Sequence, residues 1–242
     1  MGPLLPVIGL LVALVESFLI YKATRNTRRA QLLKNLPLSR IGELQAGLVK
    51  VQGQAVAPRG TLRSPLADRE CVYFHFQVQE KRRRHAFPHG GSAYWRTVVN
   101  DAQSAPCALD DGTGSAVFHM KSAELVLNLD EEERSGFLDT ARPELEETLQ
   151  EQYGYSSVGL IFNRTLYYSE TRIEEGDELL VLGTARQTAD DGWELVQAYG
   201  PLLVSNLGLA DLRASFRNAA IGWWCLVVLV FVAAGAAVAG FS

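Results

Sequence analysis

Cysteine and histidine are scarce in this chain, with three cysteines and four histidines among 242 residues. Cys71, Cys107 and Cys225 provide neither an even number for a disulfide framework nor a CxxC pair, so we expect reduced, buried thiols. The histidines do not stand at the spacing of a known metal site. The sequence therefore predicts no metal centre and no cofactor.

Motifs of common enzymes are also missing. The chain has no Gly-x-Ser-x-Gly nucleophile elbow, no Walker phosphate loop and no strand–glycine–helix dinucleotide fingerprint. Gly112 and Gly114 are expected in a turn between two strands, whereas a dinucleotide site would need a helix after them. The lack of a nucleophile or an acid–base constellation favours a protein that is not an enzyme.

Charge is missing from both ends of the chain. Ala219 to Phe241 is 23 residues without a charge, and Pro3 to Tyr21 is 19 residues interrupted only by Glu16. Each segment is long enough to cross a bilayer as a helix. We expect transmembrane helices at 3–21 and 219–241, the second preceded by a connecting helix at 208–218.

Basic residues are concentrated after the first apolar segment. Residues 22–43 form a basic juxtamembrane segment, in which six Lys or Arg and no acid occur between residues 22 and 40. Five of these side chains are predicted to face the lipid: Lys22, Arg25, Arg28, Arg29 and Lys34. Arg213 and Arg217 precede the second apolar segment, and no charge follows it. By the positive-inside rule, the central domain is cytoplasmic and both termini lie across the membrane.

The central region, 44–207, is predicted to be mainly β. Its clearest strand is Cys71 to Gln79, where Val72, Phe74, Phe76 and Val78 alternate with polar residues. We expect Phe74 and Phe76 to face the interior of a barrel. Segment 93–99 is expected to pair with this strand. The other predicted strands are 44–56, 107–110, 115–120, 125–129, 165–172, 178–185 and 193–198. One acidic helix is predicted at 142–153.

Two groups of residues are candidates for binding. The run Lys81, Arg82, Arg83 and Arg84 predicts either an anion-binding patch or a solvated hairpin tip. Tyr94 and Trp95 could add base stacking to it, although nucleic acid is the weakest of the partners considered. Small residues of the second apolar segment stand at small-xxx-small spacing and are candidates for self-association: Gly235, Ala236, Ala239 and Gly240.

The order of several short motifs resembles a known family. Ser64-Pro65-Leu66 is followed by Cys71-Val72-Tyr73, and later Ser169 to Asp177 runs into Val181 to Ala185. This arrangement between two apolar segments is similar to the GIDE, or "beside a membrane", domain of mitochondrial RING ubiquitin ligases and their prokaryotic relatives. The resemblance covers roughly residues 44–207.

The chain departs from that family in one respect. The two zinc ions of a RING need eight Cys or His ligands, whereas this sequence has three cysteines and four histidines. A RING cannot be built from these residues. The resemblance therefore implies no catalytic residue in this chain.

These observations together predict an architecture and leave the function open. The turn around Asp111-Gly112 and the late Glu175-Gly176-Asp177 turn favour an OB-like antiparallel β-barrel of five to seven strands with one inserted helix, flanked by two transmembrane helices. The favoured function is a membrane-tethered, non-enzymatic scaffold or sensor that contacts lipid and presents the domain to a protein partner or ligand. The alternatives are a component of a ubiquitin-ligase system whose RING is on another chain and, more weakly, a nucleotide- or oligonucleotide-binding barrel.

Overall fold

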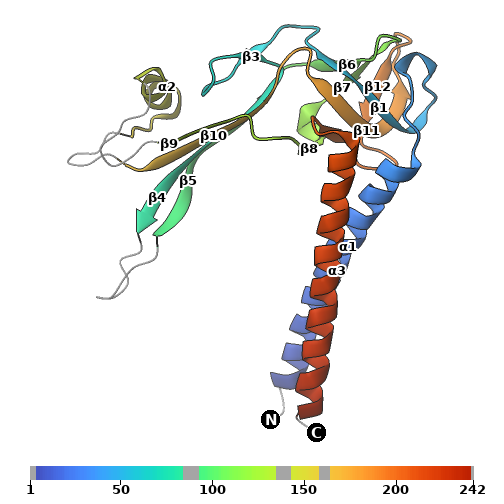
Figure 1. Cartoon of the computed structure of the whole chain (residues 1–242), viewed down its shortest axis with the longest axis vertical. Coiled ribbons are helices and arrows are strands. Elements are labelled where there is room, and N and C mark those ends of the chain that lie inside the picture. Colours follow the sequence, from blue (N-terminus) through green and yellow to red (C-terminus); the bar gives the residue numbers. More distant parts are fainter. Residues whose placement is uncertain (1–3, 84–92, 135–142, 158–163, 241–242) are drawn as a thin grey trace. The chain divides into compact units, whose positions relative to one another are not determined.

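The computed structural model describes residues 4–83, 93–134, 143–157 and 164–240. The chain forms two compact units (Figure 1). The helical unit consists of Met1–Pro37 together with Gly208–Ser242, and the β unit consists of Leu38–Leu207.

The helical unit is an antiparallel pair of long helices, α1 (Leu4–Asn35) and α3 (Leu209–Gly240) (Figure 1). The rings of Phe18 and Trp223 meet edge to face, with their centroids 6.4 Å apart. Both helices are continuous, so residues 22–35 of the predicted juxtamembrane segment are part of α1, and the predicted connecting helix is part of α3 from Leu209 on. α1 continues beyond the first apolar segment because no proline or glycine stands between that segment and Pro37.

Among the described residues, one stretch of helix is long and apolar enough to cross a membrane. It is Leu209–Ala236, 28 residues long, and 6% of its most apolar part is buried. At about 1.5 Å per residue it exceeds the roughly 30 Å of a hydrocarbon core. The predicted first span, 3–21, begins in residues outside the described part of the chain, and its crossing of the membrane stays a prediction.

Five strands of the β unit close into a barrel. In ring order they are β1 (Gly47–Val56), β6 (Cys107–Asp110), β7 (Ser115–Phe118), β12 (Trp193–Val196) and β11 (Glu178–Gln187). The ring closes because β11 pairs with β1, from Gly47↔Ala185 to Gln54↔Glu178. The sheet continues from β11 through β13 (Leu203–Ser205) to β8 (Glu124–Val126).

Two pairings in this sheet are parallel, which corrects the prediction of an all-antiparallel barrel. β7 pairs with β12, and β8 pairs with β13, in the parallel sense. A parallel pair needs a long connection, and the many residues that separate these partners along the chain provide it.

The barrel is held by close packing at its turns. A Cβ at Gly53 of β1 would stand 2.4 Å from the backbone oxygen of Asp110, so only glycine fits there. The predicted turn after β6 is confirmed, with Gly112 at φ 78°. Asp111 Oδ2 in this turn accepts a hydrogen bond from the backbone N–H of Ile41 at 2.7 Å. Two short 3-10 helices, η1 (Ile41–Glu43) and η2 (Met120–Ser122), each contribute one buried residue to the barrel core, Ile41 and Met120.

A second, four-stranded sheet is built from two insertions into the barrel. Its order is β5 (Ala93–Ser104), β4 (Tyr73–Arg83), β10 (Leu166–Ile173) and β9 (Glu131–Arg134), all antiparallel. Helix α2 (Pro143–Tyr153) contributes to its hydrophobic core. A two-stranded ribbon, β2 (Leu62–Arg63) with β3 (Glu70–Cys71), leads into β4.

The alternation predicted for residues 71–79 is confirmed, but its core is a different one. Phe74, Phe76 and Val78 are buried together with Leu145 and Leu149 of α2, in a cluster separate from the barrel core. The expectation that Phe74 and Phe76 face the barrel interior is therefore wrong. Periodicity marks two faces of a strand, but it does not say which core one of those faces joins.

The core of the second sheet yields a stability prediction. Phe76 is fully buried, whereas the neighbouring His75 side chain is on the opposite face, bonded to Asn100 at the surface. Phe76→Ala should lower the free energy of unfolding by about 3–5 kcal/mol, because the cavity cannot be refilled without repacking. His75→Ala is the matched control and should change it by less than about 1 kcal/mol. Chemical denaturation of the full chain in detergent measures both, and a larger loss for His75→Ala would mean that the faces are inverted.

Candidate binding surface

One face of the four-stranded sheet is free of the hydrophobic core. The core cluster that includes α2 lies on the face of Phe76 and Tyr168. The opposite face, called the open face below, carries polar and aromatic residues and one alanine in matching register: His75, Gln77, Gln79 and Lys81 of β4, Trp95, Thr97, Asn100 and Ala102 of β5, and Tyr167, Ser169 and Thr171 of β10.

Hydrogen bonds between side chains order the centre of the open face. A ring nitrogen of His75 lies 2.8 Å from Asn100 Oδ1, which also accepts from Gln77 Nε2 at 3.4 Å. Gln79 Nε2 donates to Gln77 Oε1 at 3.0 Å. The bonds join β4 to β5 across the sheet. The open face is therefore a pre-ordered polar surface with donors and acceptors at fixed positions.

An aromatic corner lies at one end of the open face. The Trp95 and Tyr167 rings meet edge to face at 6.1 Å, and the Lys81 ammonium lies 5.9 Å from the Trp95 ring centroid. Trp95 remains 45% exposed. A partly exposed indole with a neighbouring cation is typical of contact sites, because it offers a rigid apolar surface and a charge together. These three residues are called the Trp95 corner below.

The structure separates the members of the predicted basic run. Lys81 is on the open face, whereas Arg82 is on the other face, where its Nε donates to Glu80 Oε2 at 2.5 Å. The hydrogen bond to Glu80 raises the pKa of Arg82. The side chain of Arg83 and all of Arg84 lie outside the described residues. Anion binding by Lys81, Arg82, Arg83 and Arg84 together stays a prediction.

Tyr167 is the residue of the corner that sequence reasoning missed. Tyr94, which was paired with Trp95 as a stacking residue, lies on the opposite face because successive strand residues alternate. Tyr167 is the aromatic residue beside Trp95, because β10 pairs with β4 in the register Tyr167↔Gln79, although Tyr167 and Trp95 are far apart in the sequence. The local signal for it is the alternation of Tyr167 with the buried Leu166 and Tyr168.

The other predicted groups lie in the helical unit. Arg29 of the basic segment lies over the Phe216 ring of α3 at 5.4 Å, and Lys22 lies over Phe18 at 5.4 Å. Lipid contact by the basic segment (Lys22, Arg25, Arg28, Arg29 and Lys34) stays a prediction. A Cβ at Gly235 would meet nothing within 4 Å. Self-association through Gly235, Ala236, Ala239 and Gly240 also stays a prediction.

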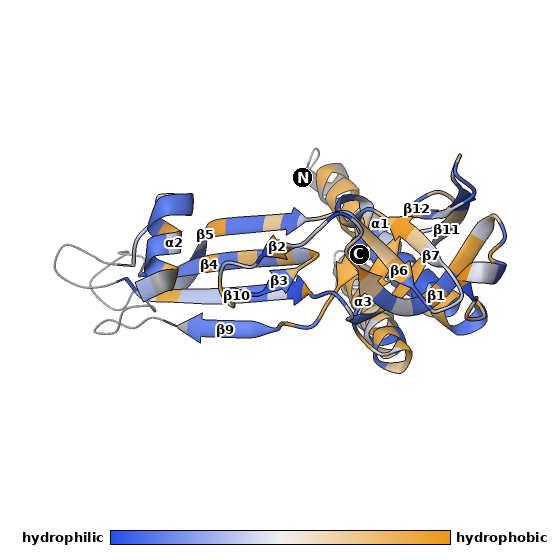
Figure 2. Ribbon diagram, turned by 90° about the horizontal axis from the view of Figure 1, so that it is seen from above, coloured by the Kyte–Doolittle hydropathy of each residue, from blue (hydrophilic) through white to orange (hydrophobic). Residues whose placement is uncertain are grey.

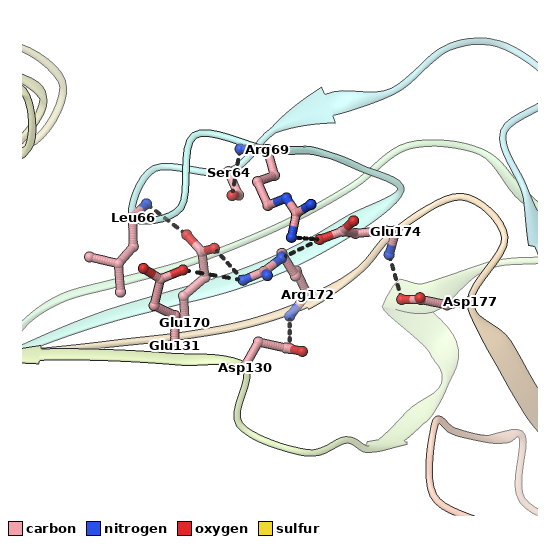
Figure 3. A network of polar contacts seen from close by, with 9 residues as sticks. All are labelled: Ser64, Leu66, Arg69, Asp130, Glu131, Glu170, Arg172, Glu174 and Asp177. Carbon is pink, nitrogen blue, oxygen red and sulfur yellow. Dashed lines mark hydrogen bonds and ion pairs between the residues drawn. The ribbon is translucent and has the colours of Figure 1, made fainter.

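A buried charge network supports the sheet from the side opposite to the open face (Figure 3). Arg172 of β10 is 9% exposed and Glu170 is fully buried, with an ion pair of 3.5 Å between Arg172 Nη1 and Glu170 Oε1. Arg172 Nε donates to Glu174 Oε1 at 2.7 Å, and Arg172 Nη1 lies 3.7 Å from Glu131 Oε2 of β9. The network thus links β10 to β9 and to the turn that leads into β11.

Backbone groups complete the network. Glu170 Oε2 accepts from the backbone N–H of Leu66 at 2.7 Å, and Asp130 Oδ2 accepts from the backbone N–H of Arg172 at 2.7 Å. The pKa of Arg172 is raised: burial opposes the charged form, but Glu174, Asp130 and Glu170 outweigh it. Arg172 is therefore charged at every physiological pH.

The described residues hold no group of three or more side chains that could bind a metal ion. The two cysteines of the β unit are buried, and burial raises the pKa of the Cys71 thiol to about 11 and of the Cys107 thiol to about 12. Both thiols are protonated at neutral pH and are poor nucleophiles.

Breaking the charge network should destabilise the β unit. Arg172→Met leaves the buried carboxylate of Glu170 without its cation, and we expect a loss of about 3–5 kcal/mol in the free energy of unfolding. The double variant Glu170→Gln/Arg172→Met removes both charges and should recover part of this loss. Arg63→Ala is the control, because Arg63 pairs with Asp68 at the exposed surface and should cost at most about 1 kcal/mol. Equal losses for Arg172→Met and Arg63→Ala would contradict this role.

No family model, curated protein or solved structure matches this chain. The resemblance to the GIDE family, and the ligase-related function that it implies, therefore remain predictions from the sequence motifs. The functional argument depends on the geometry of the chain itself.

Proposed function

We propose that this chain is a membrane-tethered, non-enzymatic scaffold whose β unit presents the open face to a protein partner or ligand. The observation that carries the proposal is the exposed apolar surface of Leu209–Ala236. Only 6% of its most apolar part is buried, and the helix follows the β unit directly after Leu207. A helix with such a surface is stable in lipid, where its backbone groups are all paired within the helix.

The tether is proposed to have two spans. Large apolar side chains of α1 are exposed over more than two turns, from Leu10 to Phe18. Because α1 packs antiparallel on α3, the same bilayer would take up both apolar surfaces. The basic residues after the proposed first span support a cytoplasmic β unit with both termini on the opposite side.

The barrel is proposed to be of the OB type. Counted 1 to 5 along the chain, the ring strands follow the order 1-2-3-5-4, and the pair 3–5 (β7 with β12) is parallel. This arrangement supports a Greek-key barrel of the OB class. The second sheet then arises from extensions of two barrel connections, between β1 and β6 and between β7 and β11.

The positions and contacts of the ionisable groups support a binding role. Two buried charges of the β unit, Glu170 and Arg172, pair with each other and hold strands together, and burial keeps the thiols of Cys71 and Cys107 protonated. By contrast, the open face keeps its polar groups at the surface. This division between a rigid support and an exposed surface is typical of recognition modules.

Partner recovery tests the proposal. The full chain, extracted from its own membranes in mild detergent, should bring with it a bound partner in fixed proportion. Trp95→Ala and Tyr167→Ala should each lower this recovery by at least about tenfold, because aromatic anchors carry much of the energy of an interface. Tyr199→Ala is the matched control, since Tyr199 is 77% exposed and lies outside the second sheet. Full recovery with Trp95→Ala and Tyr167→Ala would contradict a role for the open face.

The proposed topology is tested separately with reporters. A reporter fused after Ser242 should lie across the membrane from a reporter inserted in the β unit. Replacing Arg25, Arg28 and Arg29 by Gln should weaken this orientation without releasing the chain from the membrane, because the apolar helices anchor it. Finding both reporters on one side would show that α3 does not cross.

A further inference from the structure

The second sheet ends in a long outer strand. β5 is 12 residues long and pairs with β4 on one side, and among the described residues no strand pairs with its other side (Figure 2). Only Val99 of this strand is buried. The outer edge therefore presents a row of backbone donors and acceptors that another strand could use.

The two edges of this sheet differ in their protection. β9, at the other edge, has four residues and carries Glu131, Glu132 and Glu133. Short length and repeated like charge are the usual means of preventing edge pairing. β5 contains no proline and no lysine, and its sequence YWRTVV has high β propensity. Apart from one β-bulge, the β5 edge lacks these protections and can accept a partner strand.

A β-bulge in the middle of β5 shifts by one residue the alternation of its side chains between the two faces of the sheet. The register passes from Val78↔Val99 to Gln79↔Thr97, so Val98 has no residue opposite it. As a result, Thr97 and Asn100 both lie on the open face, and Arg96 and Asp101 both lie on the face covered by α2.

This bulge makes β5 complementary to itself. If two copies pair their β5 strands antiparallel with full overlap, Ala93 meets Ser104 and the faces match along the whole length. Arg96 then lies opposite Asp101 twice, once on each side of the two-fold axis, and Thr97 lies opposite Asn100. A shift of one residue would bring open-face residues against α2-face residues, and a shift of two would lose both ion pairs.

We propose that β5 is a self-association edge, through which a second copy of this chain extends the sheet to eight strands in the register Arg96↔Asp101. Asp101 is already oriented, because its Oδ2 accepts from Tyr153 Oη at 2.8 Å, and a carboxylate can accept further donors. This inference goes beyond the proposed function. If the tether is correct, confinement of both copies to one bilayer raises their effective concentration.

Charge exchange tests the register. The full chain in detergent should be dimeric by light scattering, and R96D or D101R alone should weaken the dimer roughly tenfold, because each places two like-charged pairs opposite each other. Co-expressed R96D and D101R chains with different tags should form the mixed dimer, in which both ion pairs are restored with reversed signs on one side. A monomeric parent chain, or R96D and D101R chains that never pair with each other, would overturn the proposal.

A disulfide test covers the case in which D101R fails to fold. In a Cys225→Ser background, differently tagged Thr97→Cys and Asn100→Cys chains should cross-link under mild oxidation, because directly opposite residues lie about 4.5–5.5 Å apart. Thr97→Cys with Ala102→Cys is the matched control, two residues out of register, and should cross-link severalfold less. Equal cross-linking in both pairs, or none in either, would contradict the proposed register.

Discussion

The pairing of β1 with β11 is the constraint on which the rest of the β unit depends. It joins residues 47–54 to residues 178–185, so a strand from the start of the unit meets one from near its end. This contact closes the five-stranded barrel, which removes the exposed edges that an open sheet of these strands would have. Because the ring is closed, the long connections between β1 and β6 and between β7 and β11 must fold outside it. The second sheet is the result.

The second sheet needs its own means of stability, because its strands come from two separate connections. β4 and β5 come from the connection after β1, whereas β9 and β10 come from the one after β7. An apolar core under α2 holds one face, and the Arg172 network links the two contributions through Glu170, Glu131 and the backbone of Leu66. With one face held in this way, the other is free to carry polar side chains. The open face exists because the network and the core are both on the opposite side.

Sequence reasoning succeeded where the signal was local. The alternation in residues 71–79, the turn at Gly112 and the helix ending at Tyr153 all depend on neighbouring residues, and the structure has each of them. It failed where partners are distant. β9 was not predicted, since Glu131–Glu133 has the composition of a solvated loop and becomes a strand through its pairing with β10 and the nearby Arg172. Likewise, periodicity correctly predicted that the Phe76 side chain is buried, but the expectation that it lies in the barrel core was wrong.

The candidate site was predictable only in part, for the same reason. Trp95 lies on a segment that was predicted to pair with residues 71–79, and Lys81 follows that strand by two residues, so their proximity is what a longer hairpin would give. Tyr167 lies next to them because β10 pairs with β4, a pairing that no local sequence pattern predicts. Treating Lys81 and Arg82 as one patch ignored the period of two that a strand imposes, and the structure puts them on opposite faces.

The membrane tether is the claim on which the proposed function depends most, and one native side chain can report it. Cys225 is exposed on α3, while the thiols of Cys71 and Cys107 are buried with raised pKa values, so a thiol-reactive fluorophore should label Cys225 alone in the folded chain. In reconstituted vesicles, a quencher attached to lipid acyl chains should reduce the fluorescence strongly, and a water-soluble quencher should not. Efficient quenching from water with no effect of the lipid quencher would contradict a membrane-spanning α3.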